Sequence, residues 1–514
     1  MLTLIEYFKG QREDFMYRQT IIKGALILTI ANVITRIIGF FYRIYMAKTI
    51  GAEGMGLYQL ITPLYILVWS VSSSGLSTTM SKLTAQEKAR GAIGNVKRIL
   101  HYSLFAAVSI AFLFSLVTYN FSEFIAEIIV KDIRTALSLR IISICFPFMA
   151  AGSILRGYYL GLQNTTISAI SQVLEQSVRM VVIYLLAGVF IPKGLEYACG
   201  AAVCGMAAGE IISFLYVFIY YIIKRKKYSK PIISPRGAVV MIAAMAVPLT
   251  LNRMVGSLFS TAENLLMPQQ LQVYGMTQAE AISLLGRLTG MAMPLITFPS
   301  SLLTALATAT MPAISESYAL HNHTRIKSTL HQSLTITAII SAFTTGMFIA
   351  FPTELGNLIY SQTQIGKMLK TLAVLCPFMY TQVTMSAVLN GLGEQLFIFK
   401  TGLFSSIVNI CAICFAIPFY GIEGFIYPWI INSIATTFMT IYRVNNVLNI
   451  NIPIVRQYIK PALAIAAACL CGNLGFHHVW NNIEYKNSVI ATLISVFMIY
   501  IFLIFQLGCI SKED

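Results

Sequence analysis

The chain has 514 residues, of which 57% are hydrophobic and only 11% are charged. About a quarter of the residues in an ordinary soluble domain are charged, so this chain has too little polar surface to fold as one. The formal net charge of +16 would suit a nucleic-acid partner. However, the lysines and arginines lie mostly in short segments between apolar runs, so we expect membrane lipids around the chain and no nucleic acid.

A membrane-spanning helix needs about 20 mostly apolar residues, and the chain contains fourteen such runs. In chain order we predict spans at 21–46, 57–80, 99–120, 136–161, 167–191, 197–223, 238–260, 283–311, 332–352, 368–392, 397–419, 423–445, 461–480 and 487–508. The predicted fold class is therefore an all-α integral membrane protein of about fourteen helices.

The lysines and arginines between the spans predict the orientation of the chain. With the N-terminus in the cytoplasm, 22 of them lie in inner segments and seven in outer loops. Cytoplasmic loops of membrane proteins carry the excess of these residues. We therefore expect a multi-pass protein of the cell membrane with both termini cytoplasmic.

The two halves of the chain match each other at a constant offset. Residues 96–104 (VKRILHYSL) align with 326–334 (IKSTLHQSL), and at the same offset the PFM of 147–149 recurs at 377–379. Each repeat holds six spans, so both enter the membrane in the same direction and enclose a central cavity, as in transporters. The predicted domains are an N-terminal lobe, a basic cytoplasmic linker, a C-terminal lobe and two extra helices, at 19–223, 224–237, 238–448 and 457–508.

Four arginines within the predicted spans are candidates for a ligand site. Asn32, Arg36 and Arg43 are spaced to lie on one face of the first helix. The pair Asn252 and Arg253 occupies the matching place in the second half, and Arg287 lies early in span eight. A charge at a helix centre costs at least about 2.5–3.5 kcal/mol, so such residues face a cavity or a partner. Guanidinium groups bind phosphate through paired hydrogen bonds, and we predict that these six residues bind a diphosphate in the cavity.

The other three arginines within spans have simpler interpretations. Arg140 and Arg156 lie near the ends of span four, where they can reach the membrane surface, and Arg179 follows Glu175 by four residues and can pair with it. The three aspartates of the chain are isolated, which leaves no carboxylate cluster for Mg²⁺. We therefore expect no catalytic residues, no metal and no cofactor, and a transporter rather than an enzyme.

Five segments of the N-terminal region resemble a known family. They are residues 23–29 (KGALILT), 35–40 (TRIIGF), 51–58 (GAEGMGLY), 75–77 (GLS) and 81–83 (SKL). This pattern is similar to stage V sporulation protein B of endospore-forming bacteria, within the multidrug/oligosaccharidyl-lipid/polysaccharide (MOP) flippase superfamily. The resemblance implies two six-helix lobes plus two helices, as in MATE transporters and lipid II flippases, and alternating access.

The resemblance also implies a cargo. It is an undecaprenyl-diphosphate-linked cell-wall precursor, which in sporulation would be peptidoglycan lipid II for the spore cortex. Cell-wall synthesis enzymes are further expected partners. Two alternatives remain open within transport, a flippase for another polysaccharide repeat unit and a MATE-type exporter. A third, of a different class, is a non-transporting membrane scaffold for wall synthesis, which would not need the arginines.

Overall fold

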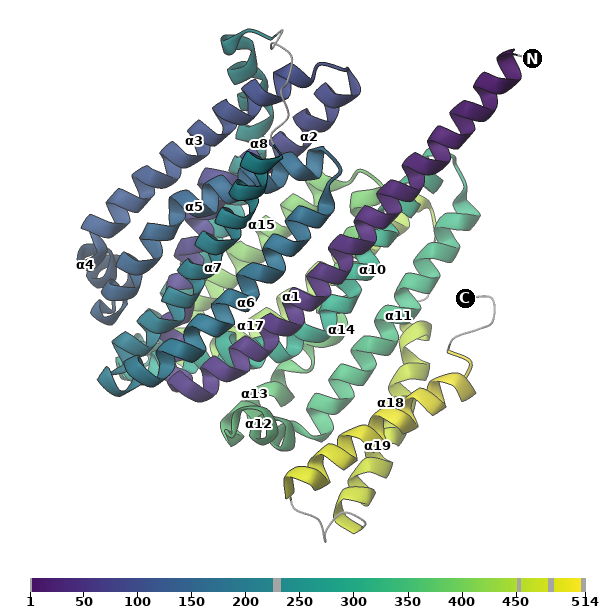
Figure 1. The fold of residues 1–514 in the computed structure, drawn as a ribbon. Coiled ribbons are helices and arrows are strands. Elements are labelled where there is room, and N and C mark those ends of the chain that lie inside the picture. The colour runs from purple at the N-terminus through teal and green to yellow at the C-terminus, as the bar shows by residue number, and fades with distance from the viewer. Residues whose placement is uncertain (1, 225–232, 451–453, 479–484, 510–514) are drawn as a thin grey trace. The chain divides into compact units, whose positions relative to one another are not determined.

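The computed structural model describes residues 2–224, 233–450, 454–478 and 485–509. These residues are almost entirely helical, and no strand occurs among them. In a bilayer a helix satisfies its own backbone hydrogen bonds, which is why apolar runs this long become helices. The predicted all-α membrane fold is confirmed (Figure 1).

Ten helices in the described ranges are long and apolar enough to cross a membrane, or eleven if α13 and α14, bent by 55° at their junction, form one span. The longest of these segments, Leu26–Ala89, includes the first predicted span from Leu26 onward and the whole of the second. Within α1 (Leu2–Trp69) two helices meet at a kink at Gly51, where the backbone adopts a non-helical φ of 72°. The number fourteen is not confirmed by this count and stays a prediction.

Two compact units divide the chain, and each is described here by itself. The first comprises Met1–Tyr42 and Leu57–Leu265. Within it, α3, α5, α6 and α7 pack side by side, and α2 packs against α3 and α5 (Figure 1). Its elements are α1 (Leu2–Trp69, in part), the π-helix η1 (Ser70–Ser74), α2 (Gly75–Ala89), α3 (Ile93–Asn120), α4 (Ser122–Phe124), η2 (Ile125–Val130), η3 (Ile133–Thr135), α5 (Ala136–Gly161), α6 (Thr165–Phe190), η4 (Ile191–Lys193), α7 (Leu195–Ile223) and α8 (Pro235–Val273, to Leu265).

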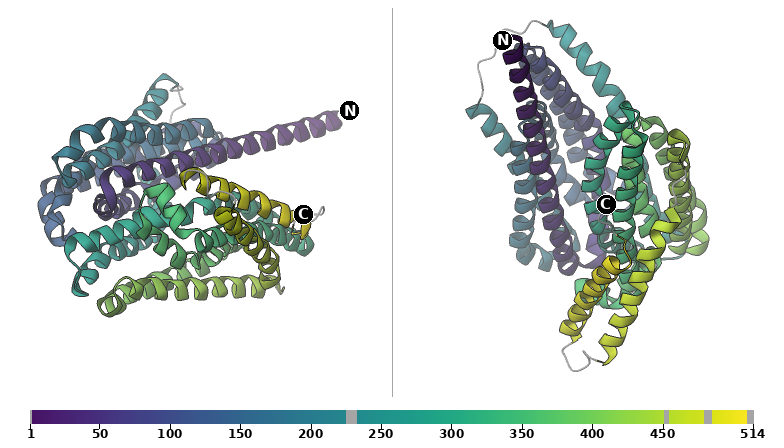
Figure 2. Two further views of the ribbon diagram at one scale, coloured as in Figure 1. Left: turned by 90° about the horizontal axis from the view of Figure 1, so that it is seen from below. Right: turned by 90° about the vertical axis from the view of Figure 1, so that its right-hand side faces the viewer.

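The second unit comprises Arg43–Gly56 and Leu266–Asp514. In it α10, α11, α14 and α17 pack together, and α18 and α19 lie side by side, with α18 against α11 (Figure 2). Its remaining elements are α9 (Gln278–Leu285), η5 (Gly286–Ala292), α10 (Met293–Ala319), α11 (His323–Ala350), α12 (Pro352–Tyr360), α13 (Thr363–Leu372), α14 (Leu375–Gly391), α15 (Gln395–Cys411), η6 (Ala412–Ala416), α16 (Ile417–Tyr420), α17 (Glu423–Leu448), α18 (Ile454–His478) and α19 (Tyr485–Gln506).

The lobe boundaries expected from the sequence stay a prediction, and most of the basic linker, residues 225–232, lies outside the described ranges. The internal repeat itself is visible in the helices, because α3 and α11 begin and end at positions related by the offset of the sequence repeat. Left-handed backbone conformations recur at the same offset, in the pairs Gly91 and His321, Lys131 and Ser361, and Gln163 and Gly393. Because the paired residues differ in type, the repeated feature is the shape of the turns that end the helices.

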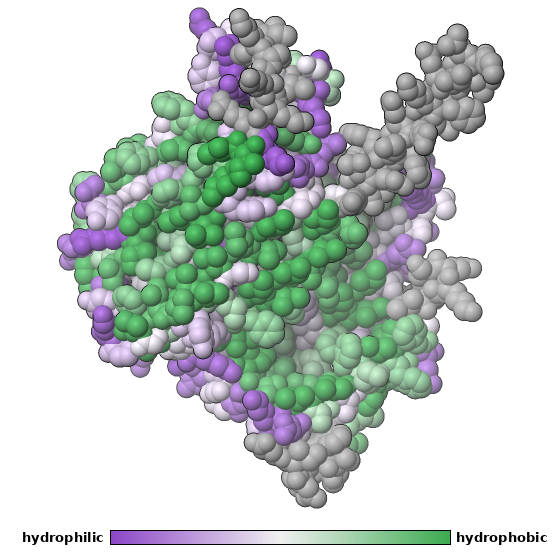
Figure 3. Space-filling view, viewed as in Figure 1, coloured by the Kyte–Doolittle hydropathy of each residue, from purple (hydrophilic) through white to green (hydrophobic). Residues whose placement is uncertain are grey.

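Apolar side chains cover much of the surface between the polar ends of the helices (Figure 3). Many large ones are more than half exposed, among them Phe105, Tyr184, Phe419 and Phe502. A water-soluble protein rarely exposes such extended apolar patches. The surface therefore agrees with a multi-pass membrane protein whose helices face lipid.

Glycines let the helices of the second unit approach backbone to backbone. A methyl group at Gly286 would overlap the carbonyl oxygen of Ala52 and lie 2.6 Å from the amide nitrogen of Gly56. One at Gly56 would in turn overlap the carbonyl oxygen of Ile282. The start of η5 is thus held against the segment that follows the bend at Gly51.

Gly286→Ala should destabilise the protein by about 1–3 kcal/mol, because the added methyl forces two backbones apart. Gly188→Ala in α6 is the matched control, since a methyl there meets nothing within 4 Å. Thermal unfolding in detergent would measure both. Equal melting temperatures for the two variants would contradict the close contact.

Candidate functional site

The first part of α1 carries two of the predicted site residues, Asn32 and Arg36, both exposed on the first unit. They are four residues apart and so lie on one face of the helix. Among the described residues, Arg36 makes no hydrogen bond or ion pair. Its guanidinium group can therefore bind an anionic ligand without first breaking a contact within the protein.

Arg253 on α8 is exposed next to Asn252 and is partly engaged within the first unit. Its Nη1 atom donates to the carbonyl oxygen of Ser74 at 3.0 Å, and its Nη2 atom donates to Oγ1 of Thr78 at 3.2 Å. Ser74 ends the π-helix η1, and π-helical turns are frequent at functional sites. Neither partner is an acid, so the positive charge of Arg253 is not neutralised by these contacts.

Small residues bring α8 against η1 and the start of α2. The Oγ atoms of Ser70 and Ser257 lie 2.6 Å apart, and Oγ1 of Thr261 donates to the carbonyl oxygen of Pro63 at 3.2 Å. A methyl group at Gly75 would overlap Oγ1 of Thr250. These contacts fix the position of Arg253 beside the last turn of η1.

Arg43 and Arg287 belong to the second unit. Arg43 is exposed, and its positive charge acts on the hydroxyl group of Tyr360. Burial raises the pKa of Tyr360, and the positive charge of Arg43 opposes that rise. Tyr360 donates at 3.1 Å to the carbonyl oxygen of Met291 in η5. Arg287, also in η5, is partly buried, and its Nε atom has no hydrogen-bond partner.

The six predicted site residues thus divide between the two units. Asn32, Arg36, Asn252 and Arg253 lie in the first, and Arg43 and Arg287 in the second. No acidic side chain in the described part of the chain pairs with any of the four arginines. That they form a single cationic lining of one cavity stays a prediction.

The other arginines within spans have partners. Arg140 pairs with Glu123 at 2.7 Å, and Arg179 pairs with Glu175 at 2.9 Å, as the spacing of the second pair predicts. Arg156, expected at the membrane surface, instead donates at 3.0 Å to Oγ of the buried Ser213 on α7. Arg140 and Arg179 thus have acidic partners, whereas Arg156, like Arg253, is held by neutral groups.

Sequence reasoning predicts the Glu175–Arg179 pair but not the polar cluster around it inside the first unit. Tyr65 of α1 donates to Oε1 of Glu210 on α7, and the Glu175–Arg179 pair of α6 lies beside it. The backbones of α6 and α7 approach closely here, since a methyl group at Gly209 would lie 2.7 Å from the carbonyl oxygen of Glu175. Tyr65 and Glu210 are far apart along the chain, and only the tertiary fold brings them together.

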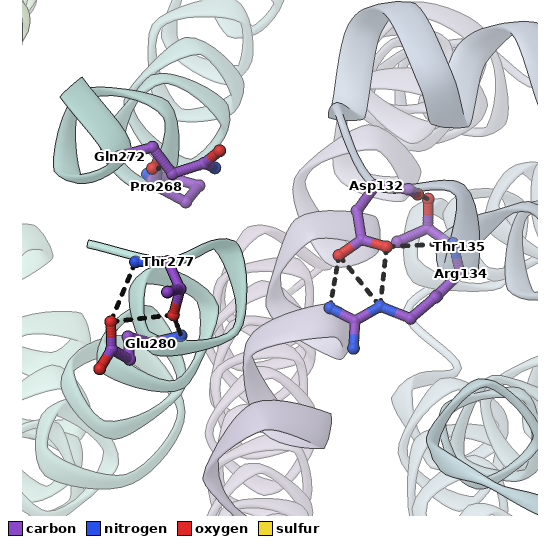
Figure 4. Close-up of polar contacts among 7 residues, drawn as sticks. All are labelled: Asp132, Arg134, Thr135, Pro268, Gln272, Thr277 and Glu280. Atoms are coloured by element: carbon purple, nitrogen blue, oxygen red, sulfur yellow. Dashed lines mark hydrogen bonds and ion pairs between the residues drawn. The ribbon is translucent and has the colours of Figure 1, made fainter. Parts of the chain in front are cut away.

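Polar groups at the connections between helices are satisfied locally (Figure 4). Asp132 is buried and accepts hydrogen bonds from the backbone and the guanidinium group of Arg134, the shortest at 2.7 Å. Thr277 and Glu280 form a capping box at the start of α9. Groups of three or more potential metal ligands do not occur among the described residues. We therefore assign the polar residues of these turns to capping of the helices and not to ligand binding.

Many apolar helices with an internal repeat are typical of membrane transporters. The model of the family "Polysaccharide biosynthesis protein" matches residues 21–318, and the MatE model matches residues 288–415. Stage V sporulation protein B of Bacillus subtilis is 31% identical over 464 residues, which are 89% of each chain. Lipid II flippase MurJ of the same organism is 24% identical over 342 residues, 61% of each chain.

Solved structures agree on the fold. Lipid II flippase MurJ in an inward closed conformation superposes with a TM-score of 0.70 at 16% identity, covering 93% of this chain and 98% of that one. An inward-facing multidrug resistance MATE transporter of the MOP superfamily has a TM-score of 0.66 at 15% identity, covering 83% of this chain and all of that one. The chain belongs to the polysaccharide biosynthesis protein family, as a stage V sporulation protein B-like member of the MOP superfamily. Its homologues and structural neighbours are transporters and flippases and not enzymes.

Arg36→Ala and Arg253→Ala should differ in stability. Loss of the two hydrogen bonds of Arg253 should lower the free energy of unfolding by about 1–2 kcal/mol. Truncation of the exposed and unpartnered Arg36 should change it by less than about 0.5 kcal/mol. Thermal unfolding of both variants measures the difference, and an equal loss would mean that Arg36 also has a structural contact.

Proposed function

We propose that this flippase moves an undecaprenyl-diphosphate-linked cell-wall precursor, peptidoglycan lipid II for the spore cortex, across the cytoplasmic membrane by alternating access. The observation that carries the proposal is positive charge on membrane helices without acidic partners, foremost Arg36 on α1. A charge in this setting is costly, and a bound anion would offset the cost. The names of the relatives, a sporulation protein and a lipid II flippase, support the choice of cargo.

In this mechanism the diphosphate headgroup enters a central cavity while the lipid tail stays in the bilayer. Arg36, Arg43, Arg253 and Arg287 bind the phosphate oxygens, because each guanidinium donates two parallel hydrogen bonds and stays charged at any physiological pH. Asn32 and Asn252 add neutral donors beside Arg36 and Arg253. Rocking of the two lobes then exposes the headgroup on the opposite side.

Arg253 has a defined role in this cycle. Its present hydrogen bonds to Ser74 and Thr78 hold its guanidinium against the first unit. A phosphate can replace the weaker Thr78 contact while the Ser74 contact continues to orient the side chain. Arg36 needs no such exchange, and we therefore expect Arg36 to contribute more to headgroup affinity than Arg253.

The orientation and the partners complete the proposal. Both termini lie in the cytoplasm, as the excess of lysine and arginine in alternate loops predicts. Precursor is made on that side, so the headgroup is captured there and released outside. Cell-wall synthesis enzymes are the partners that supply and consume it.

A MATE-type exporter is the second candidate, favoured by the MatE model over residues 288–415. Export of cationic drugs calls for carboxylates in the cavity, whereas the charged candidates of this chain are arginines. A flippase for another polysaccharide repeat unit would use the same arginines, because the diphosphate is shared. Competition between labelled precursors with different glycans distinguishes that case.

Arg36→Ala should weaken binding of a labelled undecaprenyl-diphosphate precursor by about tenfold or more, since a charge-assisted hydrogen bond contributes about 1.5–3 kcal/mol. Arg36→Lys should recover part of the loss, because it restores the charge without the paired donors. Binding to purified protein in nanodiscs would measure both. Arg140→Ala is the control, since Arg140 already pairs with the exposed Glu123.

Cortex synthesis in a strain that relies on the Arg36→Ala, Arg253→Ala double variant tests the role in the cell. We expect it to fail although the protein reaches the membrane. Normal cortex in that strain would contradict the assigned site, and it is the outcome expected of a non-transporting scaffold.

A further inference from the structure

A groove between α10 and α14 of the second unit contains none of the proposed diphosphate-binding residues. Its volume is about 570 Å³, within the range of small-molecule sites. Five polar side chains line it, those of Thr304 and Thr308 on α10 and of Gln382, Ser386 and Asn390 on α14. Of the described residues in its walls, none is charged. A ligand of this groove is therefore held by neutral groups.

The three polar residues of α14 form a row along the helix. Gln382, Ser386 and Asn390 recur at intervals of four residues and so lie on one face, and each is partly buried. Within the described part of the chain, none of their side chains makes a hydrogen bond. Polar groups among apolar helices are costly unless water or a ligand bonds to them. The row thus supplies free donors and acceptors to the groove.

The facing wall on α10 is less free to bond. The hydroxyl groups of Thr304 and Thr308 donate to the carbonyl oxygens of Ser300 and Ala305, at 3.1 and 2.7 Å. Their oxygen atoms can still accept a further hydrogen bond. Met311 beside them supplies an adaptable apolar surface. α10 therefore offers acceptors and an apolar wall, whereas α14 offers the donors.

The internal repeat explains why the groove opens in this unit. In the first unit the matching helices α2 and α5 touch, since a methyl group at Gly157 would lie 2.4 Å from the carbonyl oxygen of Ser77. The counterpart of Gly157 is Ala387, which lines the groove because its methyl group prevents the same approach. The helices still meet one turn later, where a methyl group at Gly391 would lie 2.7 Å from the carbonyl oxygen of Met311.

The polar row on α14 is not a requirement of the repeated fold. At the repeat offset, the counterparts of Gln382 and Asn390 in the first unit are a glycine and a leucine. The counterpart of Ser386 is Arg156, whose guanidinium group donates to Ser213. The second unit therefore has free neutral groups at positions where the first unit has either apolar residues or an engaged cation.

We infer that this groove binds the sugar of the lipid-linked precursor through its hydroxyl and acetamido groups, an inference that rests on the proposed function. Side-chain amides both donate and accept hydrogen bonds, as sugar hydroxyls and acetamido groups do. An ionic ligand would find no opposite charge in the groove, and burying it there would be costly. The diphosphate is common to many precursors, so the groove adds the contacts that distinguish one glycan from another.

The position of the groove along the helices suits capture of the headgroup. Asn390 directly precedes Gly391, the last residue of α14. In the proposed orientation, the span that contains α14 ends on the cytoplasmic side. The polar row therefore begins at the membrane face where the precursor is made.

Binding of two labelled lipids to the protein in nanodiscs tests the inference. One is undecaprenyl diphosphate without sugar, and the other is the same lipid carrying an N-acetylated disaccharide. The double variant Gln382→Ala, Asn390→Ala should bind the disaccharide lipid about tenfold more weakly than the wild type, because two hydrogen bonds are lost. It should bind the lipid without sugar as the wild type does. Arg36→Ala should weaken binding of both lipids equally.

Two further variants control for indirect effects. Gln364→Ala removes an exposed amide from α13, outside the groove, and should bind both lipids as the wild type does. Ala387→Leu fills the groove and should reproduce the selective loss. Since Gln382 and Asn390 have no hydrogen bonds to lose within the described ranges, the double variant should melt at the temperature of the wild type.

Saturation-transfer NMR with soluble sugars tests the groove without any lipid. The acetyl methyl signals of N,N′-diacetylchitobiose should respond to the wild type and to Arg36→Ala, and not to the Gln382→Ala, Asn390→Ala variant. Cellobiose, which has no acetamido group, should respond more weakly. Equal responses to the two sugars would overturn the acetamido contact.

The outcomes separate this inference from the proposed cargo. Equal effects of the Gln382→Ala, Asn390→Ala variant on both lipids, or no effect on either, would overturn the sugar site. So would loss of binding of a cationic dye with no loss for the disaccharide lipid, because the groove would then be a drug site. If the wild type binds the soluble disaccharide but neither lipid, the proposed cargo fails while the sugar site stands.

Discussion

The cost of holding charge among apolar helices governs this structure. Glu175 and Arg179 meet that cost by pairing with each other, and Arg140 does so with Glu123. Arg36 and Arg43 are exposed without such partners. The balance between satisfied and unsatisfied charge therefore marks the candidate site residues, because an unpaired charge in a membrane protein is costly unless a cavity, water or a ligand compensates it.

Interruptions of the helices determine where the charged side chains sit. The segment of α1 before the bend at Gly51 is divided so that Arg36 belongs to the first unit and Arg43 to the second. The π-helix η1 ends at Ser74, whose carbonyl oxygen accepts a hydrogen bond from the guanidinium group of Arg253. The π-helix η5 carries Arg287 and is held by backbone contact through Gly286. Arg253 and Arg287 are thus each associated with a π-helical departure from regular α-helix.

The repeat explains why the two halves of the chain have similar helices but different chemistry. Helices and turns recur at one constant offset, with left-handed conformations at paired positions such as Lys131 and Ser361. The polar cores do not recur in the same way. The first unit buries Glu210 beside an ion pair, whereas the second buries amides, with Asn432 donating to Asn409 at 2.9 Å. The two units therefore share helix and turn positions but bury different polar side chains.

The sequence by itself determined the membrane class, the helical fold, the repeat and the Glu175–Arg179 pair, because these depend on composition and on spacing within one helix. It also singled out the arginines, since a charge in an apolar run is visible without a structure. Only the tertiary structure decided that Arg253 bonds to Ser74, that Arg156 turns to Ser213, and that Tyr65 meets Glu210. These contacts join helices far apart along the chain, and their geometry depends on close packing at residues such as Gly75 and Gly209 that no local pattern predicts.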